Sequence, residues 1–197
     1  MQKKLKRLFL SDLMLDASNT QRIAYVGIMT ALLVVCNMFF EFKLADTQFS
    51  LTIFFSAMTG MIIGPFFGFV ACFLGDLVGF LYNSGGFTYM PWIGLSMGVV
   101  AFVSAIIVNG FYFNFKGGIY VKLALVSVFT FLICTVAINT TCFWIVYNTR
   151  KVPYSAYLVT RLFVQGQIWN SLFNYALLFM LFPLVLRIRE LLNKNKR

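Results

Sequence analysis

Six long apolar stretches run along the chain, separated by short polar or glycine-rich breaks. A helix that crosses a lipid bilayer needs about 20 mostly apolar residues. The pattern therefore predicts an all-α integral membrane protein with six transmembrane helices. Their expected ranges are 22–42, 49–64, 66–83, 92–113, 119–147 and 156–188.

The breaks between these stretches contain residues that end helices. Gly64-Pro65 separates the second stretch from the third, and 83–86 reads Asn-Ser-Gly-Gly. Glycines follow Lys116 in 115–118, and Pro153 closes the last break. Proline and paired glycines interrupt helices because they remove a backbone donor or add conformational freedom. Six spans place both ends of the chain on the same side of the membrane.

The distribution of basic residues indicates which side that is. The chain has 16 Lys and Arg against 6 Asp and Glu. With both termini inside, the outer side keeps only Lys43, Arg150, Lys151 and Arg161, and the other twelve basic residues lie inside. Cytoplasmic loops carry the excess of Lys and Arg. Both termini are therefore predicted to be cytoplasmic.

Three regions follow from this topology. Residues 1–21 are expected to form a cytoplasmic amphipathic segment along the membrane surface, 22–188 the six-helix membrane domain, and 189–197 a basic cytoplasmic tail. In the first region the apolar side chains available to dip into the membrane are Leu8, Phe9, Leu13 and Leu15.

Composition narrows the class of protein. The chain is 60% hydrophobic and 11% charged, too few charges to cover a water-facing surface. It has no histidine, so the commonest general base is missing. Its four cysteines lie inside apolar stretches with no Cys-x-x-Cys pair, which argues against a metal site. We expect no cofactor, no metal and no enzymatic activity.

Polar residues inside apolar stretches carry most of the functional argument, because such residues are costly in a membrane and often functional. Asp76 lies within the third span. In the last span Arg161, Gln165 and Trp169 are four residues apart and would share one helix face. A second stripe on this span has the spacing i, i+3, i+7 and consists of Gln167, Asn170 and Asn174. Hydrogen bonds between helices are the competing explanation for these groups.

Aromatic residues accumulate near the outer ends of the spans. Tyr89 and Trp92 follow two glycines in an outer connection, and Asn139 precedes Trp144 in the fifth span. An interfacial aromatic belt explains Tyr89 and Trp92, whereas a mobile lid is the functional alternative. Together with Arg161 these residues predict an outward-opening pocket with flat walls and a cation suited to a carboxylate or phosphate.

Energy for transport would have to come from a partner, because the chain has no phosphate-binding loop of the GxxxxGK[ST] type. Gly27 and Ala31 form a small-xxx-small pair in the first span, which allows close approach of another helix. These features favour a capture subunit over a self-sufficient pump.

Several segments resemble the S components of energy-coupling factor (ECF) vitamin transporters, particularly the folate-type group. The resemblance covers most of 22–185. The segments that carry it are Thr30-Ala31-Leu32-Leu33, 57–68 with its Gly-Pro-Phe-Phe-Gly end, Gly75-Asp76-Leu77-Val78-Gly79, Ile138-Asn139-Thr140 and Thr160-Arg161-Leu162.

The resemblance implies a six-helix subunit of the bacterial plasma membrane that captures a vitamin, folate by expectation, from outside. It also implies a transmembrane coupling subunit and two cytoplasmic ATPases as partners, with Gly27 and Ala31 facing the coupling subunit. The expected substrate-binding residues are Asp76, Tyr89, Trp92, Asn139, Trp144, Arg161, Gln165 and Trp169.

The chain departs from the folate-type pattern after Arg161-Leu162, where Phe163-Val164-Gln165 replaces Ile-Lys-Asn. Trp144 also comes later after Asn139-Thr140 than the family's tryptophan does. These changes leave cobalamin and pantothenate open as vitamins. Two other classes stay open: a membrane-embedded lipid-modifying enzyme that uses Asp76 with Arg161, and an assembly subunit whose polar residues only pack helices.

Overall fold

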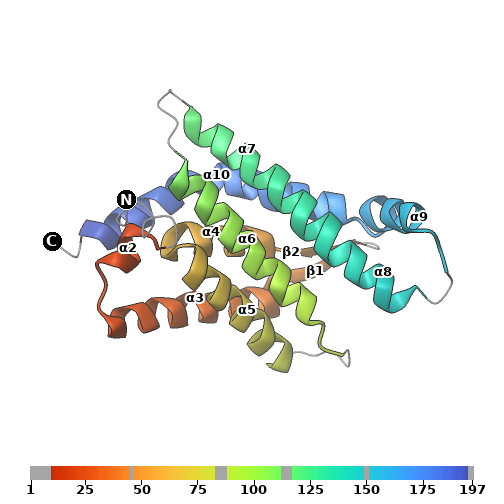
Figure 1. Ribbon diagram of the computed structural model, residues 1–197, viewed down its shortest axis with the longest axis horizontal. Helices are drawn as coiled ribbons and strands as arrows, with labels where there is room; N and C mark the ends of the chain where they lie inside the picture. The colour runs from red at the N-terminus through yellow and green to blue at the C-terminus, as the bar shows by residue number, and fades with distance from the viewer. Residues whose placement is uncertain (1–9, 45–46, 83–87, 112–116, 149–150, 195–197) are drawn as a thin grey trace.

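The computed structural model describes residues 10–44, 47–82, 88–111, 117–148 and 151–194, and it is an elongated helical bundle with one short hairpin (Figure 1). In chain order the elements, with π-helical segments labelled η, are α2 (Asp12–Leu15), α3 (Asn19–Phe39), β1 (Glu41–Leu44), β2 (Thr47–Ser50), α4 (Thr52–Ile63), α5 (Pro65–Tyr82), α6 (Pro91–Gly110), α7 (Gly118–Thr130), η1 (Phe131–Thr140), α8 (Thr141–Tyr147), α9 (Tyr154–Val159), η2 (Thr160–Val164) and α10 (Gln167–Lys194).

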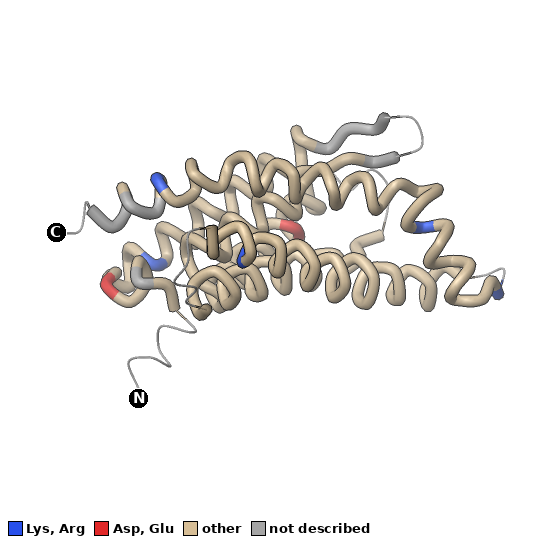
Figure 2. Tube along the Cα trace, turned by 90° about the horizontal axis from the view of Figure 1, so that it is seen from above, with Lys and Arg blue, Asp and Glu red and all other residues tan. Residues whose placement is uncertain are grey.

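Five helical stretches of the described chain are long and apolar enough to cross a membrane: α3, α5, α6, the continuous α7–η1–α8 rod, and α10. Charged residues are sparse along the part of the trace that is drawn in colour (Figure 2). The prediction of an all-α integral membrane protein is confirmed. The second expected span is represented by α4, which has only 12 residues.

Helix α4 lies inside the bundle, in contact with α3, α5, α6 and α10. Ten of its twelve residues are buried, so it has no polar face to present to solvent. Helices α4 and α6 approach each other closely because Gly60 of α4 has no side chain. A Cβ at this position would overlap the backbone of Ala101 in α6. The α4–α5–α6 block is thus a tightly packed support for the site.

The connection expected at 43–48 is instead part of an antiparallel hairpin in which Glu41 pairs with Ser50 and Leu44 with Thr47. The first helix ends at Phe39 and the next begins at Thr52, so both expected spans were too long at this point. The sequence 41–44 alternates polar and apolar residues, a period of two that favours a strand.

The last expected span, 156–188, is not one helix. Gly166 has a φ of 70°, in the left-handed region that glycine adopts without strain. It separates η2 from α10, and the helix axis is interrupted there. The expectation of a single helix was wrong because Gly166 breaks it.

The segment before the first span also differs from expectation. Leu13 and Met14 of α2 are 1% and 0% exposed, packed in the protein core and not along a membrane surface. The Arg22 side chain donates from Nε to the Met14 carbonyl oxygen at 2.9 Å and so holds α2 in place. Leu8 and Phe9 lie outside the described residues. A capping box at Ser18 starts α3, three residues before the expected beginning.

Candidate functional site

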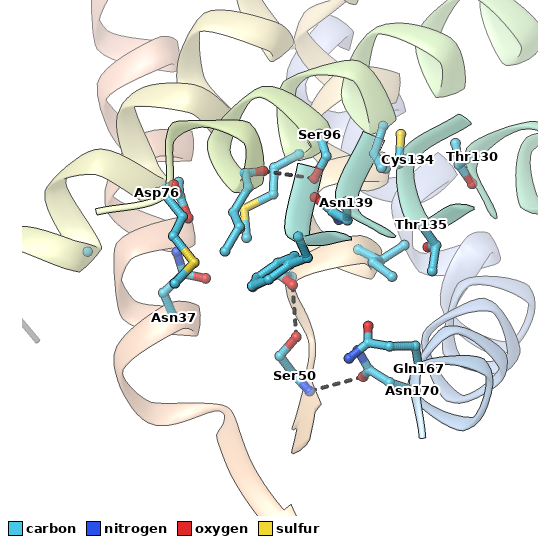
Figure 3. Close-up of a pocket in the computed structure, with 18 of the residues that line it drawn as sticks. Asn37, Ser50, Asp76, Ser96, Thr130, Cys134, Thr135, Asn139, Gln167 and Asn170 are labelled. Atoms are coloured by element: carbon cyan, nitrogen blue, oxygen red, sulfur yellow. Dashed lines mark hydrogen bonds between the residues drawn. The ribbon is translucent and has the colours of Figure 1, made fainter. Parts of the chain in front are cut away.

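A cavity of about 460 Å³ opens among the helix ends near the β1–β2 hairpin (Figure 3). Its volume lies within the range of known ligand pockets, about 300–1,000 Å³. The lining comes from α3, β2, α4, α5, α6, α7, η1, α8, η2 and α10, together with the segment before α6. Amides, hydroxyls, one carboxylate and one guanidinium share its described walls with phenylalanine and methionine side chains.

Asp76 of α5 forms the acidic part of the cavity and is 8% exposed. It lies against the first turns of α6: a Cβ at Gly94 would be 2.8 Å from Asp76 Oδ2 and 3.2 Å from the Tyr89 hydroxyl oxygen. The positive end of a helix dipole stabilises a carboxylate there. Asn37 of α3 lines the same side of the cavity (Figure 3).

Tyr89 supplies a hydrogen-bond donor beside this carboxylate. Burial raises the pKa of Tyr89 to about 12, and the neighbouring negative charge of Asp76 acts in the same direction. The phenol therefore keeps its proton at neutral pH. A carboxylate acceptor and a phenol donor are thus side by side, and they can bind a ligand edge that carries hydrogen-bonding nitrogens.

Arg161 of η2 supplies the cation of the site and is 8% exposed. Its guanidinium carbon lies 3.9 Å from the centroid of the Phe143 ring, a cation–π contact that holds the group against this ring. Within the described part of the chain, Arg161 Nε and Asn139 Oδ1 are buried without a hydrogen-bond partner. Buried polar atoms are nearly always paired, so these two atoms are available to a ligand.

Both residues lie on π-helical segments. Asn139 belongs to η1, where the Thr140 hydroxyl donates to the carbonyl oxygen of Thr135, five residues earlier, at 2.7 Å. Arg161 belongs to η2. π-Helical turns are rare and occur frequently at functional sites. The two residues with unpaired buried atoms, Asn139 and Arg161, are thus also the ones that lie on π-helical backbone.

Four of the eight expected binding residues line the cavity: Asp76, Tyr89, Asn139 and Arg161. The structure brings these four residues to one cavity, although they come from four separate parts of the chain.

Two expected residues lie behind the walls. Trp92 packs edge-on against Phe143 at a centroid distance of 5.7 Å, and Phe143 itself lines the cavity. Trp144 donates from Nε1 to the Val152 carbonyl oxygen at 2.9 Å and packs against Tyr154. Trp144 therefore stabilises the connection between α8 and α9.

Gln165 and Trp169 are not beside Arg161. Both are exposed, Trp169 by 58%, and neither lines the cavity. The helical spacing that put the three residues on one face does not apply: η2 is π-helical between Arg161 and Gln165, and the helix is interrupted at Gly166 before Trp169.

Other cavity residues were missed. Asn37, Ser50, Ser96 and Thr135 line the walls but stand as isolated polar residues in apolar sequence. Gln167 and Asn170 also line the cavity, and their polar stripe was the signal that could have identified them. Gly27 and Ala31 lie on the exposed face of α3, away from the cavity, and nothing lies within 4 Å of a Cβ at Gly27.

Comparison with known proteins identifies the family to which the chain belongs. The sequence profile described as "ECF-type riboflavin transporter, S component" matches residues 17–187. A solved structure, "Crystal structure of FolT bound with folic acid", is similar with a TM-score of 0.58 and 23% sequence identity, covering 91% of this chain and 96% of that chain. At this identity the structural likeness shows the fold alone. No curated protein sequence matches the chain.

The family profile spans the whole bundle from the start of α3 to the last turns of α10. S components bind a vitamin and associate with the energising module of an ECF transporter. The enzyme alternative is thereby excluded. The chain belongs to the family of ECF-type riboflavin transporter S components and is the substrate-binding, multi-pass membrane subunit of a bacterial vitamin importer.

Proposed function

We propose that the vitamin is folate. The observation that carries this proposal is the Asp76 carboxylate beside the Tyr89 hydroxyl at one side of the cavity. The pterin ring of folate presents its 2-amino group and its N3–H side by side on one edge. Two adjacent donors match the two oxygens of a carboxylate. Asp76 is the group that would bind this edge.

Arg161 supports the same vitamin from another wall. Folate ends in a glutamate with two carboxylates, and the planar guanidinium of arginine binds carboxylates through two parallel hydrogen bonds. The unpaired Nε–H of Arg161 would donate to one of these carboxylates. Phe80 and Phe143 provide aromatic surface along the cavity wall.

Riboflavin is the second candidate, and the family profile favours it. Its isoalloxazine edge carries one N–H between two carbonyl oxygens, and its ribityl chain is a neutral row of hydroxyls. Side-chain amides suit such a ligand because each offers donors and an acceptor. Asn37, Asn139 and Asn170 line the cavity and would serve this purpose.

One titration separates the candidates. The purified chain in detergent would be titrated with folate, riboflavin, cobalamin and pantothenate, first as wild type and then as Asp76→Asn. We expect tight folate binding that weakens about 10- to 100-fold in Asp76→Asn, the scale of a charge-assisted hydrogen bond. Riboflavin binding that survives in Asp76→Asn, with no folate binding to the wild type, would establish the second candidate.

We also propose that the cavity faces the outside and that both termini are cytoplasmic. The support is the excess of Lys and Arg at the other ends of the helices. A reporter protein that is active only in the cytoplasm should therefore be active when it is fused to the C terminus.

Transport should require the energising module, so proteoliposomes with this chain alone should bind the vitamin without accumulating it.

A further inference from the structure

Asn174 of α10 is fully buried and hydrogen-bonded at both ends of its amide. Its Oδ1 accepts from the Phe54 backbone N–H at 3.0 Å. Its Nδ2 donates to the Ser50 carbonyl oxygen at 2.6 Å and to the Asn170 carbonyl oxygen at 2.9 Å. The exposed fraction of Asn174 is 0%. One side chain thus connects α10 with two backbone positions about 120 residues earlier in the chain.

The bond to Phe54 serves the start of α4. The first backbone N–H groups of a helix have no partner within the helix. α4 begins at Thr52, and its N-cap residue, Leu51, makes no side-chain cap hydrogen bond. Asn174 supplies the missing acceptor from a different helix. The start of α4 therefore depends on α10 for its capping.

The bonds to Ser50 and Asn170 fix the adjoining strand. The Ser50 backbone N–H donates to Asn170 Oδ1 at 3.0 Å (Figure 3), while Asn174 Nδ2 also lies 3.1 Å from that same oxygen. The last residue of β2 is therefore held through both its N–H and its carbonyl group. The two asparagines act as one unit.

Asn170 of this unit lies in the cavity wall, and Asn174 lies behind it. Ser50, Thr52, Ile53 and Asn170 line the cavity, whereas Asn174 is outside the lining. We propose that Asn174 is a positioning residue for vitamin binding: it locks the end of β2 and the start of α4 onto α10 and so sets how long the vitamin is retained. The proposal rests on the cavity being the vitamin site.

Removing the amide should release this wall. Without Asn174, two backbone groups in the interior lose their partners and must reach water or move. The wall would then open more often, and the vitamin should leave faster while its rate of entry changes little. We expect the dissociation rate to rise about tenfold or more in Asn174→Leu, which keeps the number and branching of the side-chain heavy atoms and removes the hydrogen bonds.

The experiment combines the dissociation rate of folate, or of riboflavin if the titration above identifies it, with hydrogen–deuterium exchange of the unliganded chain in detergent. Asn174→Leu is compared with wild type, and Asn174→Ala provides a smaller replacement, with room for water, if the leucine variant does not fold. Backbone exchange should accelerate in the peptide spanning residues 50–56. A matched control is Asn109→Leu, which removes an amide contact to the Met61 carbonyl oxygen at the other end of α4, with N to O at 3.5 Å.

In both Asn174 variants we expect faster ligand dissociation and faster backbone exchange in residues 50–56. Asn109→Leu should show neither change, even when its melting temperature falls as much as that of the Asn174 variants. A dissociation rate that rises equally in Asn109→Leu would reduce Asn174 to a general stabilising role and overturn the proposal. An unchanged dissociation rate in the Asn174 variants would overturn it as well. The exchange measurement needs no ligand, so it distinguishes failure of this proposal from failure to identify the vitamin.

Discussion

Asp76 and Arg161 show why isolated charged residues in apolar helices were informative. A charge within a membrane protein is expensive unless it meets a partner or a cavity. Both side chains line the cavity, and each is supported locally: Asp76 by the start of α6 and Arg161 by the Phe143 ring. At this scale the chemistry of a residue type predicted its location well.

Arg161→Ala should weaken folate binding about 10- to 100-fold, because a charge-assisted hydrogen bond contributes about 1.5–3 kcal/mol and each decade of affinity corresponds to about 1.4 kcal/mol. Titration of the purified chain measures the affinity. Lys151→Ala is the control, since Lys151 is exposed outside the cavity and should matter little.

Pterin, the ring system of folate without its benzoyl-glutamate part, carries no carboxylate and tests the assignment further. Its affinity should be nearly the same for wild type and Arg161→Ala. An equal loss for folate and pterin, accompanied by a lower melting temperature without ligand, would mean that Arg161 serves stability and not the acidic tail.

Gly94→Ala should weaken binding about tenfold or more. The new Cβ would lie 2.8 Å from Asp76 Oδ2, so the carboxylate must move away from its position beside Tyr89. Overpacking of this kind costs about 1–3 kcal/mol. The measurement is again a titration. Gly27→Ala, where nothing lies within 4 Å of the added Cβ, should bind as wild type, and equal affinities in the two variants would contradict the placement of Asp76.

At the scale of the secondary-structure elements, irregular and interrupted helices determine which polar residues reach the cavity. The rod from Gly118 to Tyr147 changes to π geometry in its middle, and the last span changes at Thr160 and stops at Gly166. Each change presents a polar residue to the cavity. Predictions from residue spacing assume a regular α-helix with 3.6 residues per turn. The π-helical segments could therefore not be predicted from the spacing of polar and apolar residues.

Gly166→Ala should destabilise the chain by about 1–2 kcal/mol, the cost of a left-handed backbone for a residue with a Cβ. For a chain of this size that corresponds to about 2–4 °C in melting temperature for each kcal/mol. It should also weaken vitamin binding, since Arg161 lies five residues before the break.

Gly117→Ala is the matched control for this prediction. Gly117 also has a positive φ, 93°, but it is exposed and far along the chain from the cavity residues. Its replacement should lower the melting temperature and leave the affinity intact. If the affinity falls equally in both variants, the break at Gly166 has no particular role in presenting Arg161.

At the scale of the whole molecule the sequence predicted the bundle, and four of the eight expected binding residues line one cavity. The apolar stretches located all the long helices, because length and hydropathy alone identify membrane spans. The hairpin, the buried α2 and the position of Asn37 depended on contacts between distant segments, such as the side chain of Arg22 holding α2. Such contacts have no periodic signature in a single sequence.

The exposed face of α3 predicts where the energising module binds. Only 17% of the apolar window of α3 is buried within the subunit, and Gly27 and Ala31 lie on its exposed face. Ala31→Trp should abolish transport by the complete transporter and leave vitamin binding intact, because a bulky side chain prevents close helix approach. Uptake into proteoliposomes and titration of the isolated chain measure the two effects.

Met180→Trp is the control for that prediction. Met180 is 74% exposed on α10, in another part of the surface. This variant should transport as wild type. If the transport rate falls equally in both variants, tryptophan harms the subunit in the lipid and α3 has no special role in docking.

The separate origin of the cavity's polar groups has an evolutionary consequence. Asp76 comes from α5, Asn139 from η1, Arg161 from η2 and Asn170 from α10, while the packed block of α4, α5 and α6 contributes support. A substitution at one of these positions can alter one edge of the ligand site and leave the other edges in place. Subunits of this design can acquire a new cargo through a few exchanges, so close relatives can share a fold, a docking face and an energy source while importing different nutrients.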